Sequence, residues 1–155
     1  MFFRAIAVLF AFSAMSAYAT TSGSKYMDGL INLVVDKESK QELTAAKNDI
    51  YLPKRERNVL ILTVMMKQPA HVKDAFFIQL LNEQSKQARR NHLAQSHLKD
   101  VEPALVSAYN KLEDLKLDMD ISDFTQDQEE RMILSSLSPR QLRILGTIGT
   151  DEFVA

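Results

Sequence analysis

The stretch PALVSAYNKLEDL, residues 103–115, decides the fold class of this chain. Its apolar residues recur three or four positions apart, which places them on one face of an α-helix. This face consists of Leu105, Ala108, Tyr109, Leu112 and Leu115. Proline stands first, where its missing N–H costs little because the first N–H groups of a helix have no partner inside it. We therefore expect an amphipathic helix that begins at Pro103.

The other three prolines open similar stretches. Pro53 precedes charged residues and an apolar run, Pro69 precedes a long stretch with one polar face, and Pro139 precedes the last apolar stretch. The sequence predicts helices over about 53–67 and 69–93, a helix from 139, and an earlier one over about 26–46 that breaks near Asp36. The apolar run 59–66 is also compatible with a buried strand, but the proline and charges before it favour a helix.

Two capping boxes predict further helix starts. Thr125 with Gln128, and Ser138 with Gln141, fit the pattern in which a hydroxyl bonds a helical N–H and the glutamine reaches back. Strand signals are sparse by comparison. Together these patterns predict one all-α domain over residues 20–155, a compact bundle of about five to six helices.

The first residues have the pattern of an export signal. A single basic residue, Arg4, precedes an apolar run over residues 5–12, and small residues end at Ala19. The run is shorter than the roughly 20 residues that a membrane span needs. We expect cleavage after Ala19 and a secreted, extracellular protein (periplasmic if the source is bacterial) without stable membrane insertion.

Composition excludes several functional classes. The formal net charge of −1 argues against nucleic acid as a partner, because that binding neutralises phosphates with basic residues. There is no cysteine to act as a nucleophile or to form a disulfide. The sequence also lacks a glycine-rich phosphate loop and an H-E-x-x-H metal motif. We therefore expect no enzymatic activity and no catalytic residues, and a protein or a small ligand of unknown identity as partner.

The three histidines, His71, His92 and His97, are expected to be ordinary surface residues. His92 and His97 lie five positions apart, about 140° around a helix, so they cannot hold one metal on one helix face.

The long stretch after Pro69 carries two further features. Its basic cluster, Lys86, Arg89 and Arg90, is expected to be a solvated helix face, with an anionic partner as the alternative. Its aromatic pair, Phe76 and Phe77, is expected in the core, with a lipid pocket between helices as the alternative.

The acidic stretch DMDISDFTQDQE, residues 118–129, is the best candidate for a binding site. Calcium takes six to eight oxygens, and a twelve-residue loop between two helices supplies them from fixed positions. The residues at these positions are Asp118, Asp120, Ser122, Phe124 through its carbonyl, Gln126 and Glu129. Glu129 is expected in the first turn of the exiting helix, where the loop requires a bidentate glutamate.

The loop departs from the pattern at its sixth position, where Asp123 stands in place of glycine. We therefore expect weak binding of calcium or magnesium, on the order of 10⁻⁴–10⁻³ M for calcium. The alternative is an acidic helix start, because negative side chains near a helix N-terminus are stabilised by the helix dipole alone. The earlier segment 47–52 lacks the ligand pattern and is at best a degenerate partner loop.

From about Leu43 to Leu145 the chain resembles the SXP/RAL family of secreted nematode proteins. The resemblance rests on the turn at residues 47–49, the pair Phe76 and Phe77, and residues 108–112, 125–128 and 137–139. It implies a helical fold similar to paired EF-hands, secretion and a divalent-cation-binding role. Many members of that family are antigens.

Two other classes remain open. The segments from Phe124 to Gln128 and from Leu137 to Gln141 are similar to the paired motifs of the Spy/CpxP periplasmic chaperones. The apolar helix faces are also compatible with a secreted lipid carrier.

Overall fold

The computed structural model describes residues 23–151 and 153, with side chains from residue 27 onward. The predicted signal peptide, residues 1–19, lies outside the described residues. Within them the chain forms helices joined by loops and contains no strand, so the all-α class is confirmed. The helices are α2 (Gly23–Leu33), α3 (Lys37–Asn48), α4 (Lys54–Lys67), α5 (Ala70–His97), α6 (Pro103–Leu117), α7 (Asp123–Ser135) and α8 (Pro139–Thr147). This is slightly more than the expected five to six, because the stretch 26–46 forms two helices.

The prolines stand where the sequence predicts helix starts. Pro103 and Pro139 lie in the first turn of α6 and α8, while Pro53 and Pro69 are the N-caps of α4 and α5. The run 59–66 lies inside α4, so the helical interpretation of that run is confirmed.

The break between α2 and α3 has a local cause. The carboxylate of Asp36 caps α3 by accepting a hydrogen bond from the backbone N–H of Ser39 at 2.7 Å. That bond, with further ones from the Ser39 hydroxyl and Gln68, lowers the pKa of the Asp36 carboxyl. An aspartate in this role favours a new helix start over continuation of the old helix.

One of the two predicted capping boxes forms. Ser138 Oγ accepts the backbone N–H of Gln141 at 3.3 Å, and the Gln141 side chain accepts the N–H of Ser138 at 2.8 Å. The prediction that Thr125 begins a helix is wrong. Instead Ser122 is the N-cap of α7, and its Oγ accepts the N–H of Thr125 at 3.2 Å.

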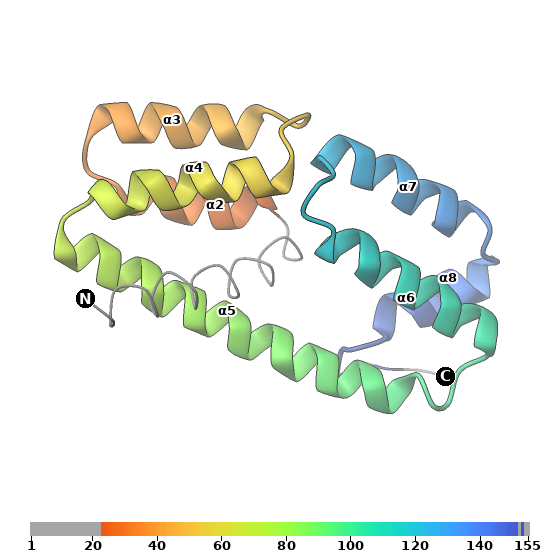
Figure 1. The fold of residues 1–155 in the computed structure, drawn as a ribbon. Helices are drawn as coiled ribbons and strands as arrows, with labels where there is room; N and C mark the ends of the chain where they lie inside the picture. The colour runs from red at the N-terminus through yellow and green to blue at the C-terminus, as the bar shows by residue number, and fades with distance from the viewer. Residues whose placement is uncertain (1–22, 152, 154–155) are drawn as a thin grey trace.

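The helices form two groups along α5 rather than a single bundle (Figure 1). In the first group α2 packs on α3 and α5, and α4 packs on α3 and α5. In the second, α6 packs on α7 and α8. The 28-residue α5 belongs to both groups and runs beneath them.

The main hydrophobic core lies in the first group. It consists of Met27, Leu30, Val34, Leu43, Ala46, Ile61, Val64, Met65, Val72, Phe76 and Leu80. Phe76 is 1% exposed and Phe77 packs against the same cluster, so the expected role of this pair in the core is confirmed.

The two groups are joined at the loops 49–53 and 118–122, which have equal length. Pro53 and Ser122 form an antiparallel bridge, and they are the N-caps of α4 and α7. The N–H of Lys54 donates to the carbonyl of Ile121 at 3.1 Å, and backbone bonds from Arg55 to Met119 and from Phe124 to Ile50 flank it. Two helix–loop–helix units, α3–α4 and α6–α7, thus meet through their loops.

Two cations of α4 reinforce this joint. Lys54, 3% exposed, donates from Nζ to three carbonyls at the end of α6, those of Leu115, Lys116 and Asp118, at 2.7–3.3 Å. Arg57, 8% exposed, pairs with the Asp123 carboxylate at 2.6 Å. Nη2 of the same guanidinium donates to the carbonyl of Asp49 at 3.1 Å. Since the last carbonyls of a helix carry partial negative charge, a cation there stabilises the helix end.

We expect Arg57→Ala to lower the free energy of unfolding by about 2–3 kcal/mol, because it leaves the partly buried Asp123 and loop carbonyls without partners. Arg55→Ala is the matched control. It removes an equally close pair with Asp120, at 2.8 Å, but both side chains are more than half exposed. An exposed pair contributes less than about 1 kcal/mol. Urea denaturation checks both, and equal losses would contradict a special role for the buried arginine.

Candidate functional site

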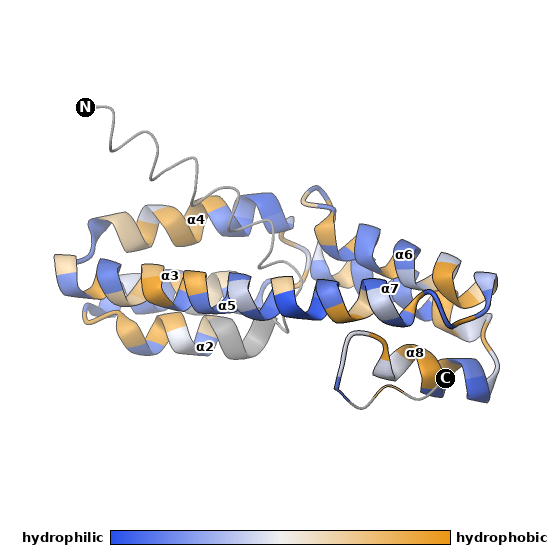
Figure 2. Cartoon of the chain, turned by 90° about the horizontal axis from the view of Figure 1, so that it is seen from below, coloured by the Kyte–Doolittle hydropathy of each residue, from blue (hydrophilic) through white to orange (hydrophobic). Residues whose placement is uncertain are grey.

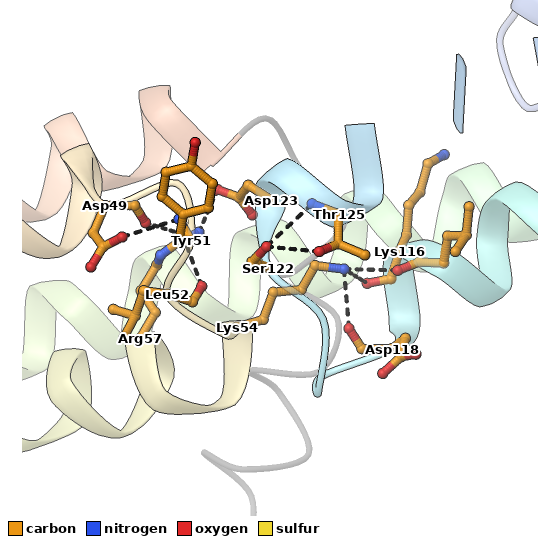
Figure 3. Close-up of polar contacts among 11 residues, drawn as sticks. Asp49, Tyr51, Leu52, Lys54, Arg57, Lys116, Asp118, Ser122, Asp123 and Thr125 are labelled. Carbon is orange, nitrogen blue, oxygen red and sulfur yellow. Dashed lines mark hydrogen bonds and ion pairs between the residues drawn. The ribbon is translucent and has the colours of Figure 1, made fainter. Parts of the chain in front are cut away.

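The first two residues of the predicted cation loop make contacts of their own. The Asp118 carboxylate accepts the backbone N–H of Asp120 at 2.9 Å, and Asp120 pairs with Arg55 at 2.8 Å. The backbone carbonyl of Asp118 faces the ammonium of Lys54 (Figure 3). A cation in this loop would have to compete with these two basic side chains.

The next three residues lie at the start of α7. Ser122 uses its hydroxyl as the N-cap, the ring of Phe124 packs on Tyr51 with centroids 4.9 Å apart, and Gln126 donates to Glu130 at 2.6 Å. Because α7 begins at Asp123, Glu129 lies in its second turn, and its expected place in the first turn is wrong.

The first and last residues of the predicted loop line the same cavity. Asp118 and Glu129 line a cavity of about 360 Å³ between α6 and α7, together with Asp114 and Lys111. However, no group of three or more His, Asp or Glu side chains in the described part of the chain is placed to hold a metal ion. The calcium or magnesium site therefore stays a prediction.

A larger cavity of about 510 Å³ lies in the second helix group. It is lined by residues of α5, α6, α7, α8 and the segment that follows α8, and it is open to solvent on one side. Its apolar lining consists of Tyr109, Leu112, Leu134, Leu142, Leu145 and Ile148. The volume falls within the range of about 300–1,000 Å³ that is typical of ligand pockets.

The second group has little core of its own. Its buried apolar residues among those described are Ala94, Leu105, Ala108 and Ile148, of which two are alanines. Neither α7 nor α8 contains a buried residue. Yet hydropathy alternates along α6, α7 and α8 as it does along α3 and α4 (Figure 2). The apolar side chains in this half therefore line a cavity instead of packing against one another in a core.

The charged residues in the lining of the large cavity are Arg90, Glu113 and Lys116, which carry a net charge of one positive unit. Lys116 pairs with Glu113 at 2.7 Å, so their charges compensate. Arg90 on α5 is exposed at the cavity, and no hydrogen bond or ion pair joins its side chain to any described residue. Burial, with a smaller effect of Glu113, raises the pKa of Tyr109 to about 12 and keeps its hydroxyl protonated.

The segment after α8 folds back onto α5 and forms one wall of the cavity. Gly149 has φ +79, and a Cβ there would lie 3.2 Å from the Arg90 carbonyl, so only glycine fits both the backbone and the space. Its N–H donates to Nδ1 of His97 at 3.2 Å, and His97 stacks on Phe153 with ring centroids 4.1 Å apart. Asp151 accepts two bonds from Arg89, at 2.9 and 3.0 Å.

Sequence analysis missed this wall. The expectation that His97 is an ordinary surface residue is wrong, because it is partly buried and accepts the N–H of a residue 52 positions away. Glycine at 149 indicates a backbone turn. The sequence near it does not show that this turn packs against α5.

Comparison with protein families, with characterised proteins and with solved structures finds no match to this chain. A membrane-spanning helix is not found among the described residues, since none combines the necessary length with the necessary apolar composition. The case for function therefore rests on the geometry of the chain itself.

The cation prediction has a direct test by calorimetric titration of calcium, then magnesium, into the purified protein. If the loop reorganises around an ion, we expect a dissociation constant of about 10⁻³ M or lower and a higher melting temperature. Glu129→Ala should abolish both signals, and Glu130→Ala on the same helix should not. If no heat and no rise in melting temperature are observed at a cation concentration tenfold above about 10⁻³ M, the prediction is wrong.

The environment of Tyr109 predicts a late ionisation. Tyr109 should ionise near pH 12, and Tyr109→Phe should remove this component from the ultraviolet absorbance of tyrosinate. Because the folded pKa lies above the ordinary value of 10.0, the resulting stabilisation is present below pH 10 and is lost as pH rises toward 12. Loss of a component that titrates near pH 10 in Tyr109→Phe, with none lost near pH 12, would contradict this burial.

Proposed function

We propose that this protein is an exported, non-enzymatic binding module that takes a small ligand with a large apolar part into the cavity between α5 and α6–α8. The observation that carries this proposal is the open packing of the second helix group, whose partly exposed leucines line a cavity of about 510 Å³. A ligand there would replace the missing core.

The energetic argument follows from the burial of apolar surface. Each methylene of a ligand that leaves water is worth about 0.8 kcal/mol, provided that it meets apolar walls. Leu112, Leu134 and Leu145 supply such walls from three different helices. The first helix group needs no such ligand, because its own side chains already fill its core.

Export of the module follows from the signal-like residues 1–19. Its action outside the cell, or in the periplasm of a bacterium, is part of the same proposal. A chaperone that binds unfolded clients could use the same open apolar half of the protein. The test below distinguishes this chaperone role from the binding of a small ligand.

The test uses phenylnaphthylamine, a neutral apolar dye whose fluorescence rises when it leaves water. We expect the purified protein to enhance this fluorescence with saturable binding. Gly146 lines the cavity, and a Cβ added there meets no heavy atom within 4 Å. Because Gly146 is a lining residue with room for a side chain, we expect Gly146→Trp to obstruct the cavity and to weaken dye binding at least about tenfold, or about 1.4 kcal/mol.

Gly146→Ala is the matched control, because alanine improves helix propensity and occupies little of the cavity. It should bind the dye like the unmodified protein. Equal binding by all three proteins, or no binding by any, would overturn the proposal. Suppression of client aggregation without saturable dye binding would favour the chaperone instead.

A further inference from the structure

The large cavity contains two hydrogen-bond donors that the described part of the protein does not satisfy. Arg90 and Tyr109 both line it, and neither the guanidinium of Arg90 nor the hydroxyl of Tyr109 makes a hydrogen bond with a described residue. They come from neighbouring segments of the wall, α5 and α6. An apolar pocket with a few polar groups of one kind selects a ligand with the complementary group, here an acceptor.

The charges of the lining make that acceptor an anion. Glu113 and Lys116 compensate one another at 2.7 Å, and the remaining charge in the lining is that of Arg90. Lys86 and Arg89, the other members of the basic cluster on α5, pair with Glu83 and Asp151. Arg90 is thus the member of this cluster that is left for a ligand.

The backbone position of Arg90 is fixed by the fold. Gly149 packs against its backbone carbonyl, and the bonds of Asp151 to Arg89 and of Gly149 to His97 hold the wall on either side. A guanidinium on a rigid backbone presents planar donors that match a carboxylate. Because Arg90 is also exposed, the charged end of a ligand can stay at the mouth while its chain enters.

Building on the proposed function, we propose that the ligand is an amphipathic monoanion, a single apolar chain that ends in a carboxylate or a similar group. Its anionic end binds Arg90 and accepts the hydroxyl of Tyr109. Its chain lies against Leu112, Leu134 and Leu145.

The experiment compares dodecanoate with dodecanol and methyl dodecanoate, each as a competitor of phenylnaphthylamine. All three carry the same kind of chain, so all should displace the dye if the cavity binds apolar molecules. Dodecanoate is expected to bind about tenfold more tightly than the two neutral probes, the lower end for hydrogen bonds to a charged group because Arg90 is partly solvated.

Arg90→Gln should remove that preference and leave the binding of dodecanol unchanged, while Arg90→Lys should retain part of it. Lys86→Gln is the matched control, since it removes one positive charge from the same helix one turn away from Arg90 and outside the cavity lining. It should change neither affinity.

The outcomes separate the two proposals. Equal affinities of acid, alcohol and ester, unchanged by Arg90→Gln, would overturn the anion assignment and leave the apolar binding module intact. Failure of all three probes to displace a saturably bound dye would overturn the single-chain ligand, whereas absence of saturable dye binding would overturn both proposals. Equal effects of Arg90→Gln and Lys86→Gln would show general attraction by a basic surface and would also overturn the specific role of Arg90.

Discussion

The joint between the two loops is the constraint on which the rest of this structure depends. Lys54 places an ammonium among three carbonyls at the end of α6, and Arg57 ties the first loop to the first turn of α7. Burial lowers the pKa of Lys54, while the carboxylates of Asp123 and Asp118 oppose that shift. Two cations withdrawn from water are costly unless they are paired, so their partners fix the relative position of the two helix groups.

From this joint follows the shape of the second group. The end of α6 and the start of α7 are held against α4, and α8 with the segment after it folds back toward α5. Gly149 and Asp151 then meet α5 at Arg90 and Arg89. The space left between these elements is the large cavity, so a contact at the loops sets the geometry of a site elsewhere in the same half.

Amphipathic helices form both halves of the protein, but they pack differently in each half. In the first, residues such as Leu43, Ile61 and Phe76 interdigitate and exclude solvent. In the second, Leu134, Leu142 and Leu145 share a cavity and stay partly exposed. Interiors of stable domains are close-packed, and an open apolar region of this kind is a characteristic of interaction sites.

Sequence analysis succeeded where the determining contacts are local. The Ser138–Gln141 capping box and the proline starts involve residues within one turn of each other, so their chemistry can be identified without a fold. It failed at α7, where both Ser122 and Thr125 are acceptable caps. The bridge of Ser122 to Pro53 and the pair of Asp123 with Arg57 select the earlier start, and both partners lie more than 60 residues away.

The buried cations illustrate a signal that was present in the sequence. Lys54, Arg57 and Asn58 continue the helical stripe of Ile61, Val64 and Met65, and all six are buried. Polar residues that continue the buried face of a helix indicate that this part of the face packs against polar groups instead of the apolar core. The pattern does not show which backbone carbonyls those partners are.

What the sequence determined by itself is the helical class, most helix starts, the apolar face of each helix and the export-like beginning. These depend on spacing, capping and proline, which act over a few residues. The tertiary structure decided which loops meet, where α7 begins, and that the second half holds a cavity with Arg90 at its edge. These depend on contacts between residues far apart in the chain, whose free energies are gained only after the helices have come together.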